Sequence, residues 1–558
     1  MSAAHTLVDQ PAPTQPEIAR VTNLGLAPSP DRFFTMAALG VCTLALVVRV
    51  AAAARAQGLW LDESTGIAAA LEPRLPQAVL TAVLHDARPP LYHATLWLWF
   101  HLFASVDGAR WLSIGAGLAA VALSISLAWS LWGRWPALVT GVLGALSPWH
   151  IYYSAEIRMY ALESALGVLT LWALWRSTKR GRRADWALYV VSAVAFAWTD
   201  LFAILALLGQ AAWLFWNSRS MTAAQWRKVK FAWATILVST LPLALVGAGA
   251  LTRGSGTGVH SGLLRGLTLL ADVGAGFIAT APAQIAAVCG VTILSLLTVI
   301  LMRHDPRLSF VASYFFTPIG LVFAAGLIIP VWVERTLLFV TPGFWLLVGG
   351  LVFIGMRLPT RARFAIVSAA ALVCVIEASA LMVQNSDRYL SARHLPTLTA
   401  YQFAASHAGE RFLNIENFTA APFQVLDAMN HRPTSQWELA SHRNPGMDAV
   451  RQSPLLKPFS SFLIQTSKGL AWDPGSRRVS YADIASWCNQ GSGFWLSYLQ
   501  DPEMTIQSPL ARLDVRLTTR HATPRTSSGI EPLIPADFHP DQRLAIDGTI
   551  FVHYQKSI

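Results

Sequence analysis

The sequence is short of charged residues. Asp, Glu, Lys and Arg make up 13% of its 558 residues and hydrophobic residues 54%, whereas soluble domains average about 25% charged residues. This shortage excludes an ordinary soluble fold for most of the chain. Apolar runs long enough to cross a hydrocarbon core of about 30 Å recur from Phe33 to about Val383. Because lipid offers the backbone no hydrogen-bond partner, these runs must be helical.

Cysteine is also scarce, which excludes a disulfide-stapled or zinc-bound fold. Cys42, Cys289 and Cys374 lie within apolar runs, so Cys488 is alone in the polar C-terminal part, and no C-x-x-C spacing occurs. The first 32 residues contain five prolines and no apolar core. We therefore expect residues 1–32 to form a disordered cytoplasmic tail rather than a signal peptide.

Acidic residues are too few to balance the basic ones, and the formal net charge is +11. The sequence lacks a basic stripe interleaved with aromatic residues, which would indicate nucleic-acid binding. The basic residues instead form short clusters between apolar runs, as cytoplasmic loops do under the positive-inside rule. These clusters are Arg176–Arg183, Arg227–Lys230, Arg303–Arg307 and Arg357–Arg363.

Two apolar segments decide the number of membrane spans. The run 186–217 is 32 residues long with Thr199-Asp200 at its middle, so we expect a hairpin of two short spans. Leu91–Phe103 is rich in aromatic and histidine residues and would be only about 20 Å long as a helix. We expect it to lie in the membrane interface. Eleven spans result, and every basic cluster then falls on the cytoplasmic side, with the C-terminus outside.

We therefore predict an α-helical polytopic membrane protein with about eleven transmembrane helices plus interfacial helices, and a C-terminal mixed α/β extracytoplasmic domain. The helical module covers residues 33–384 and contains a long polar first outer loop at 55–90, and the C-terminal domain covers 385–558. The expected elements of that domain are strands at 411–415, 459–464 and 493–498, and helices near 396–408 and 419–430.

The span count places nearly all remaining charges of the helical module on one face of the membrane. The 55–90 loop, the Tyr153–Arg158 turn, Asp200, the 251–281 loop and Glu334-Arg335 should all open outside. Charges near a bilayer are costly and usually mark a functional site. We therefore predict a site at the outer surface, covered by the C-terminal domain.

The acidic pair Asp62-Glu63 follows the first span. Neighbouring residues cannot share one helical face, so one carboxylate can act as a general base while the other binds a divalent cation or orients a neighbour. Further along, Pro89-Pro90 stiffens the chain and opens a helix, which would aim His85, Asp86 and Arg88. For Asp62-Glu63 the alternative is an ordinary solvated loop. For the stretch before Pro89-Pro90 it is a helix start with incidental charges.

Two further motifs carry charge at the outer face. The first is the segment Ser154–Tyr160. If it is helical, Glu156 and Tyr160 share a face, and if it is extended, Arg158 joins them. The alternative is a Glu–Arg pair that closes a helix end. In the second, Glu334-Arg335 lies between strongly apolar runs, where an arginine suits bidentate phosphate binding. The alternative is an arginine that snorkels to the interface.

Three of these motifs, in this order, resemble the bacterial dolichyl-phosphate-mannose-protein mannosyltransferase-like family of the C-type membrane glycosyltransferase superfamily. The resemblance covers roughly residues 33–220, continues more weakly through Glu334-Arg335 and is weak over 385–558. The motifs are Leu59-Trp60-Leu61-Asp62-Glu63, then Arg88-Pro89-Pro90-Leu91-Tyr92 with Arg110 downstream, then Tyr153-Ser154-Ala155-Glu156-Ile157-Arg158-Met159-Tyr160.

The resemblance implies a bacterial inner-membrane glycosyltransferase that takes a sugar from a polyprenyl-phosphate donor, with inversion, and transfers it to a cell-envelope acceptor. Asp62 matches the first-loop carboxylate that activates the acceptor or holds a metal such as Mg²⁺ or Mn²⁺, and Glu63 is open to the same roles. The residues expected to bind substrate are His85, Asp86, Arg88, Tyr92, Tyr153, Glu156, Arg158, Tyr160, Asp200, Glu334 and Arg335.

The chain departs from the family pattern at two positions. Arg88 stands where the family usually has the histidine of His-Pro-Pro-Leu, and Asp200 stands where relatives commonly have the histidine of Thr-His. The rival interpretations are a transporter, which would show internal repeats and charges near the bilayer midplane, and a non-catalytic accessory protein. The glycine-rich segment 253–258 either closes over the site or is a connector.

Overall fold

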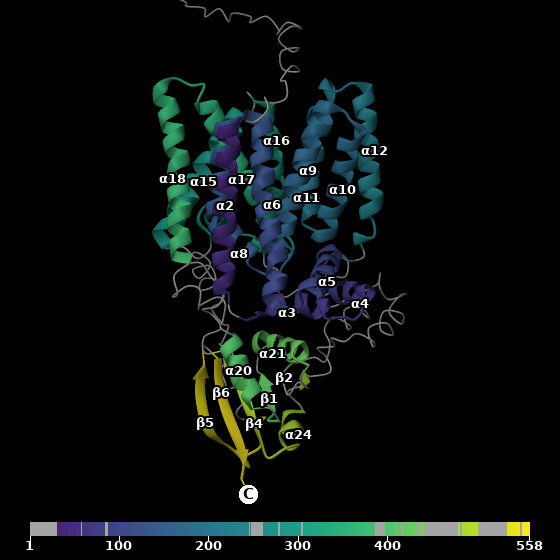
Figure 1. Ribbon diagram of the computed structural model, residues 1–558, viewed down its shortest axis with the longest axis vertical. Helices are drawn as coiled ribbons and strands as arrows, with labels where there is room; N and C mark the ends of the chain where they lie inside the picture. Colours follow the sequence, from purple (N-terminus) through teal and green to yellow (C-terminus); the bar gives the residue numbers. More distant parts are fainter. Residues whose placement is uncertain are drawn as a thin grey trace, which may run out of the picture.

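The chain forms a bundle of roughly parallel and antiparallel helices, with a small sheet beyond one end (Figure 1). The helices of the bundle that reach from one end to the other alternate in direction, so the connections fall at two opposite ends. The computed structural model describes residues 31–56, 58–83, 88–244, 246, 260–276, 280–302, 305–384, 397–407, 409–414, 417–431, 436–439, 478–479, 483–499, 533–546 and 549–557.

Six helices in the described part of the chain are long and apolar enough to cross a membrane, which supports an integral membrane protein; the count of eleven spans stays a prediction. They are α2 (Arg32–Arg55), α6 (Val106–Trp132), α15 (Ala281–Leu301), α16 (Pro306–Gly326), the pair η3 (Glu334–Val340) and α17 (Thr341–Gly355), and α18 (Thr360–Gln384). Further helices of the bundle are α7 (Arg134–Leu146), α8 (Pro148–Ser154), α9 (Tyr160–Arg180), α10 (Arg183–Thr199), α11 (Ala203–Trp216) and α12 (Ala223–Thr240).

The predicted hairpin within residues 186–217 is confirmed. Helix α10 ends at Thr199, and α11 begins at Ala203. Between them the backbone of Asp200 is extended, and its carboxylate accepts the backbone N–H of Phe202 at 2.9 Å. A short acidic side chain that binds nearby backbone N–H groups favours a turn over a continued helix, so Asp200 itself marks the break.

Two segments expected to be loops contain helices. The 55–90 segment forms α3 (Leu61–Ala70) and α4 (Leu75–Thr81), because Glu63 accepts the Trp60 backbone N–H and so starts a helix that an alanine-rich run continues. The 251–281 segment contains α14 (Leu263–Ala275), whose Leu269 and Val273 are buried in the common core. The glycine-rich stretch 253–258 lies outside the described residues.

A buried arginine ties α2 to the segment that leads into the third motif. Arg49 in α2 donates to the Gly144 carbonyl at 3.0 Å and to the Ser154 hydroxyl at 3.3 Å. Gly117 of α6 lies against this contact, and a Cβ there would be 2.9 Å from Arg49 Nε. The close packing of α2, α6 and α8 therefore fixes where the chain leaves α8 at Ser154 and turns toward α9.

The C-terminal part forms a six-stranded mixed sheet in the order β3-β2-β1-β4-β6-β5. Its strands are β1 (Phe412–Asn414), β2 (Gln436–Leu439), β3 (Arg478–Val479), β4 (Gly493–Leu499), β5 (Phe538–Ile546) and β6 (Thr549–Lys556), and its helices include α20 (Thr397–Ser406), α21 (Asn417–Met429) and α24 (Ile484–Cys488). The first three strands and β4 run parallel, whereas β6 pairs antiparallel with β4 and β5. The predicted strand at 459–464 lies outside the described residues.

Helix α21 packs directly on α3 at the end of the bundle (Figure 1). Phe423 and Leu426 of α21 belong to the same buried cluster as Ile67 of α3. The interior of the sheet, around Phe494 and Ile550, forms a second cluster of its own. The sheet is therefore attached to the bundle through the helix that carries the acidic pair.

Candidate functional site

The two carboxylates of the acidic pair point in different directions from the first turn of α3. Glu63 is fully buried: its Oε1 accepts the Ile157 backbone N–H at 3.1 Å, and its Oε2 accepts the Trp60 backbone N–H at 3.2 Å and faces Arg110 Nη2 at 3.4 Å. Both of its oxygens are therefore occupied by N–H donors. Asp62 is partly exposed, and its carboxylate faces Arg335 instead.

Asp62 forms an ion pair with Arg335, at the start of η3. Asp62 Oδ2 and Arg335 Nη1 are 3.0 Å apart, and the two side chains are 19% and 23% exposed. From the other side, Arg158 Nη1 donates to the Asp62 carbonyl at 3.1 Å and to Thr65 Oγ1 at 3.0 Å. The carboxylate of Asp62 is thus paired with Arg335, while Arg158 holds the Asp62 backbone, and the Asp62 side chain stays partly exposed.

The Tyr160 hydroxyl lies among the arginines of the site. Its ring is fully buried and packs edge-on against Tyr153, with centroids 4.9 Å apart. The hydroxyl is within electrostatic reach of Arg335, Arg158 and Arg88. It has no hydrogen-bond partner among the described residues, and neither does the buried Nε–H of Arg335. Two donors in this arginine-rich region thus have no hydrogen-bond partner among the described residues.

The two positions that depart from the family pattern are in direct contact. Arg88 Nη1 donates to Asp200 Oδ2 at 2.8 Å, and Asp200 is fully buried. Glu163, in the first turn of α9, is buried within electrostatic reach of both. Neither of its oxygens accepts a hydrogen bond from a described residue. Glu163 is not among the predicted site residues; a carboxylate in the first turn of an apolar run was the available signal.

The remaining predicted residues are divided between the rim and the interior. Tyr92 of α5 (Leu91–Phe103) and Glu156 are buried, and burial raises the pKa of the Tyr92 phenol, which keeps its hydroxyl protonated at neutral pH. Glu334 accepts the indole N–H of Trp332 at 2.8 Å. His85 and Asp86 lie outside the described residues.

The donor set does not fit a cation held jointly by the acidic pair. Both Glu63 oxygens face N–H donors, and one Asp62 oxygen is paired with Arg335. A Mg²⁺ site needs carboxylate oxygens that are open to the metal. Within the described part of the chain, no group of three or more His, Cys, Asp and Glu side chains could hold a metal ion.

Four of the five segments that were predicted to open on the outer face meet at one end of the bundle. The start of α3, the turn after α8, the end of α10 and the start of η3 are joined by Asp62–Arg335, Arg158–Asp62 and Arg88–Asp200. This is the same end against which the C-terminal helix α21 packs. The proximity of these four segments is therefore observed, while the membrane side on which they open and their chemical roles stay predictions.

No family model matches the chain, and no curated protein matches it either. The solved structures do show a likeness. ArnT from Cupriavidus metallidurans bound to undecaprenyl phosphate is 11% identical, with 93% of this chain and 97% of ArnT covered and a TM-score of 0.50. The apo form of ArnT gives the same identity and coverages with a TM-score of 0.52. Arabinofuranosyltransferase AftD from Mycobacteria is 14% identical, with 96% of this chain but 40% of AftD covered and a TM-score of 0.52.

These likenesses define the fold. The chain is similar to ArnT over nearly the full length of both proteins. The alignment with AftD spans less than half of that larger protein. The chain therefore has the fold of ArnT, while its membership of the C-type membrane glycosyltransferase superfamily and its resemblance to the mannosyltransferase-like family stay predictions.

Proposed function

We propose that the chain is a membrane glycosyltransferase that moves a sugar from a polyprenyl-phosphate donor to an extracytoplasmic acceptor. The observation that carries this proposal is the pairing of Asp62 with Arg335 beside two unused donors, Arg335 Nε–H and the Tyr160 hydroxyl. A carboxylate and a phosphate-type anion site are thus adjacent. ArnT, which has the same fold, binds undecaprenyl phosphate, and this supports a donor of that class.

The phosphate of the donor is assigned to the arginine side of the site. Arginine and tyrosine side chains offer N–H and O–H donors, and charge-assisted hydrogen bonds to phosphate are stronger than neutral ones. Arg335 and Tyr160 would contact the phosphate directly, because their donors have no partner among the described residues. Arg158 and Arg88 add positive charge nearby, although each already binds a neighbour.

The acceptor is assigned to the Asp62 side. Its hydroxyl oxygen attacks the anomeric carbon while the bond from that carbon to the phosphate oxygen breaks, and the bonding electrons leave with the phosphate. Asp62 takes the hydroxyl proton as general base, and Arg335 and Tyr160 stabilise the departing anion. A single displacement of this kind inverts the anomeric centre. The acidic pair does not fit a shared cation, and the proposed step uses only side chains of this site.

The buried Glu63 has a different role in this proposal. It positions Asp62, because it caps α3 and ties the start of that helix to Arg110 and to the Ile157 backbone. In the proposed orientation, the site and the C-terminal sheet lie on the extracytoplasmic side of a bacterial inner membrane. The packing of α21 on α3 favours a role for the C-terminal part in covering the site and selecting the acceptor.

The test measures donor-lipid binding first and turnover second. Purified protein is titrated with undecaprenyl phosphate and examined by native mass spectrometry, with Arg335→Gln as the test variant. The control is Arg134→Gln, which removes an exposed arginine paired with Asp31 away from the site. We expect binding to fall for Arg335→Gln alone. Equal binding by both variants would overturn the phosphate assignment.

Turnover is then measured as release of polyprenyl phosphate from lipid-linked sugars extracted from bacterial membranes. We expect release by the wild-type protein when acceptor material is present, and none without it. A protein that binds the lipid but never releases polyprenyl phosphate would be a transporter or an accessory protein, and the glycosyltransferase proposal would be wrong.

A further inference from the structure

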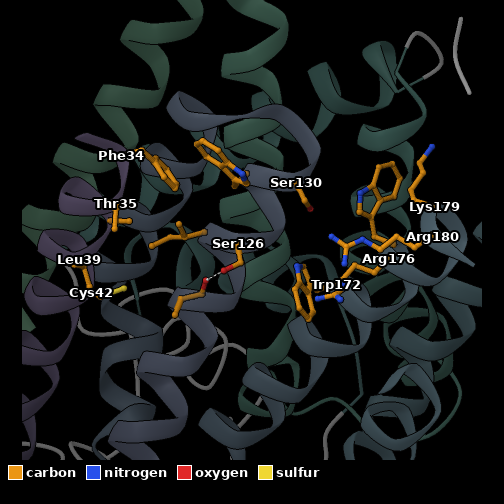
Figure 2. A pocket seen from close by; sticks show the side chains of 15 residues that line it. Phe34, Thr35, Leu39, Cys42, Ser126, Ser130, Trp172, Arg176, Lys179 and Arg180 are labelled. Atoms are coloured by element: carbon orange, nitrogen blue, oxygen red, sulfur yellow. Dashed lines mark hydrogen bonds between the residues drawn. The ribbon is translucent and has the colours of Figure 1, made fainter. Parts of the chain in front are cut away.

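A second concave site lies at the opposite end of the bundle. A cavity of about 490 Å³ is bounded by α2, α6 and α9, with α2 residues on one side and basic residues of α9 on the other (Figure 2). Helix α9 connects the two regions, since it begins at Tyr160 and ends at Arg180. At about 1.5 Å per residue, its ends are about 30 Å apart. The cavity is therefore separate from the candidate glycosyltransferase site.

The wall of this cavity is mostly apolar and open to the lipid-facing surface. Leu39 of α2 lines it and is 62% exposed. Ala122 and Ile125 of α6 continue the apolar surface. The hydroxyl of Ser126 beside them donates a hydrogen bond to the Ala122 carbonyl. A hydrocarbon chain fits such a surface, whereas a small soluble anion would leave it uncovered.

The rim of the cavity on α9 is strongly basic. Arg176 is paired with Asp185 at 3.0 Å and stacks on Trp172. Lys179 lies over the Trp175 ring at 4.8 Å, and Arg180 is exposed at the helix end. Within the described residues, no carboxylate pairs with either Lys179 or Arg180. Two cations thus face the cavity without an acidic partner among the described residues, next to an apolar wall.

We propose that this groove binds one anionic phospholipid from the membrane leaflet at that end of the bundle. The lipid phosphate would contact Lys179 and Arg180, while an acyl chain would lie against Leu39, Ala122 and Ile125. Charge complementarity selects an anionic headgroup over a zwitterionic one, because the latter brings a positive group to a basic rim. Clusters of Lys and Arg near a membrane surface attract anionic lipids in this way.

The experiment titrates delipidated full-length protein with dioleoyl phosphatidylglycerol or dioleoyl phosphatidylcholine and counts retained lipids by native mass spectrometry. We expect one phosphatidylglycerol to be retained in preference to phosphatidylcholine. The Lys179→Gln/Arg180→Gln variant should lose that preference by about 30-fold, at roughly fivefold per cation. The matched control, Arg227→Gln/Lys230→Gln, removes the same charge from α12 outside the cavity and should keep the preference.

A second variant separates the groove from general surface charge. Ser126→Trp fills the apolar part and leaves both cations in place, and we expect it to release phosphatidylglycerol as well. Retention of the lipid by Ser126→Trp, or equal loss in the α12 control, would overturn the proposal. Displacement of phosphatidylglycerol by undecaprenyl phosphate would also overturn it, because the groove would then hold the donor's tail. None of these outcomes depends on turnover, so the glycosyltransferase proposal is tested separately.

Discussion

The guanidinium of Arg88 donates to the buried carboxylate of Asp200 at 2.8 Å. These are the two positions at which the motifs depart from the mannosyltransferase-like pattern, which usually has histidine at both. A buried carboxylate without a partner is strongly destabilising. The two departures therefore compensate for each other, and the acid at one position accounts for the arginine at the other.

Arg88→His is expected to destabilise the protein, and Arg88→His/Asp200→His is expected to recover most of the loss. Breaking a buried pair costs about 3–5 kcal/mol, and the cost here should be near the lower end because Arg88 is 21% exposed. Thermal unfolding of the detergent-purified variants measures the effect. The single variants Arg88→His and Asp200→His are measured beside the double variant. If the loss of stability in the double variant equals the sum of the two single losses, the residues do not act as a pair.

Asp62→Asn is expected to abolish transfer without changing stability. Loss of a general base lowers rates by about 10²- to 10⁴-fold, while an asparagine carbonyl can still accept from Arg335. The readout is polyprenyl phosphate released from a lipid-linked sugar, compared with the melting temperature and undecaprenyl-phosphate binding. Asp107→Asn is the control, since Asp107 is 91% exposed and also lies beside an arginine of the region. Normal turnover by Asp62→Asn would contradict the base assignment.

Glu63→Gln is expected to act mainly on folding. An amide in place of the carboxylate would turn an N–H₂ group toward existing N–H donors and leave Arg110 without its buried counter-charge. A loss of about 3–5 kcal/mol is typical when one partner of a buried pair is removed. We expect a lower melting temperature and less purified protein. A fully stable but inactive Glu63→Gln protein would instead place Glu63 in the chemistry.

Tyr160→Phe is expected to weaken donor binding without loss of stability. The Tyr160 hydroxyl is buried and has no described hydrogen-bond partner, so its removal should leave the melting temperature equal or higher. A hydrogen bond to a charged group contributes about 1.5–3 kcal/mol, so affinity for undecaprenyl phosphate should fall roughly 10- to 100-fold. Tyr189→Phe is the matched control, because Tyr189 is equally buried with an unpartnered hydroxyl but lies in α10. A similar loss of affinity in both variants would argue against a phosphate contact at Tyr160.

Chelation of divalent cations is expected to leave transfer unchanged. Arg335 already neutralises Asp62, and Glu63 is engaged by N–H donors, so the acidic pair offers no open bidentate site. Transfer is measured before and after treatment with EDTA and after addition of Mg²⁺ or Mn²⁺. Activity that disappears with EDTA and returns with metal would contradict this prediction.

Much of the architecture was readable from patterns of charge and hydropathy. The break at Thr199-Asp200 followed from the length of the apolar run, and the outer-face grouping followed from counting spans. Local helix formation at 55–90 was missed, because the capping contact between Glu63 and Trp60 depends on how Glu63 is buried. The helix α14 was missed although Leu269 and Val273 stand four residues apart, as on one face of a helix, and both are buried.

The sequence by itself indicated a membrane protein and predicted that the charges outside its basic clusters gather at one end of the helices. Hydrophobic spans must be helical in lipid, and helix parity then assigns each connection to a side. Only the tertiary structure decided which carboxylate faces the site: Glu63 is buried against Arg110 and Ile157, and Asp62 meets Arg335 from a distant helix. Adjacent residues on a helix point about 100° apart, and packing rather than sequence order chooses which one faces inward.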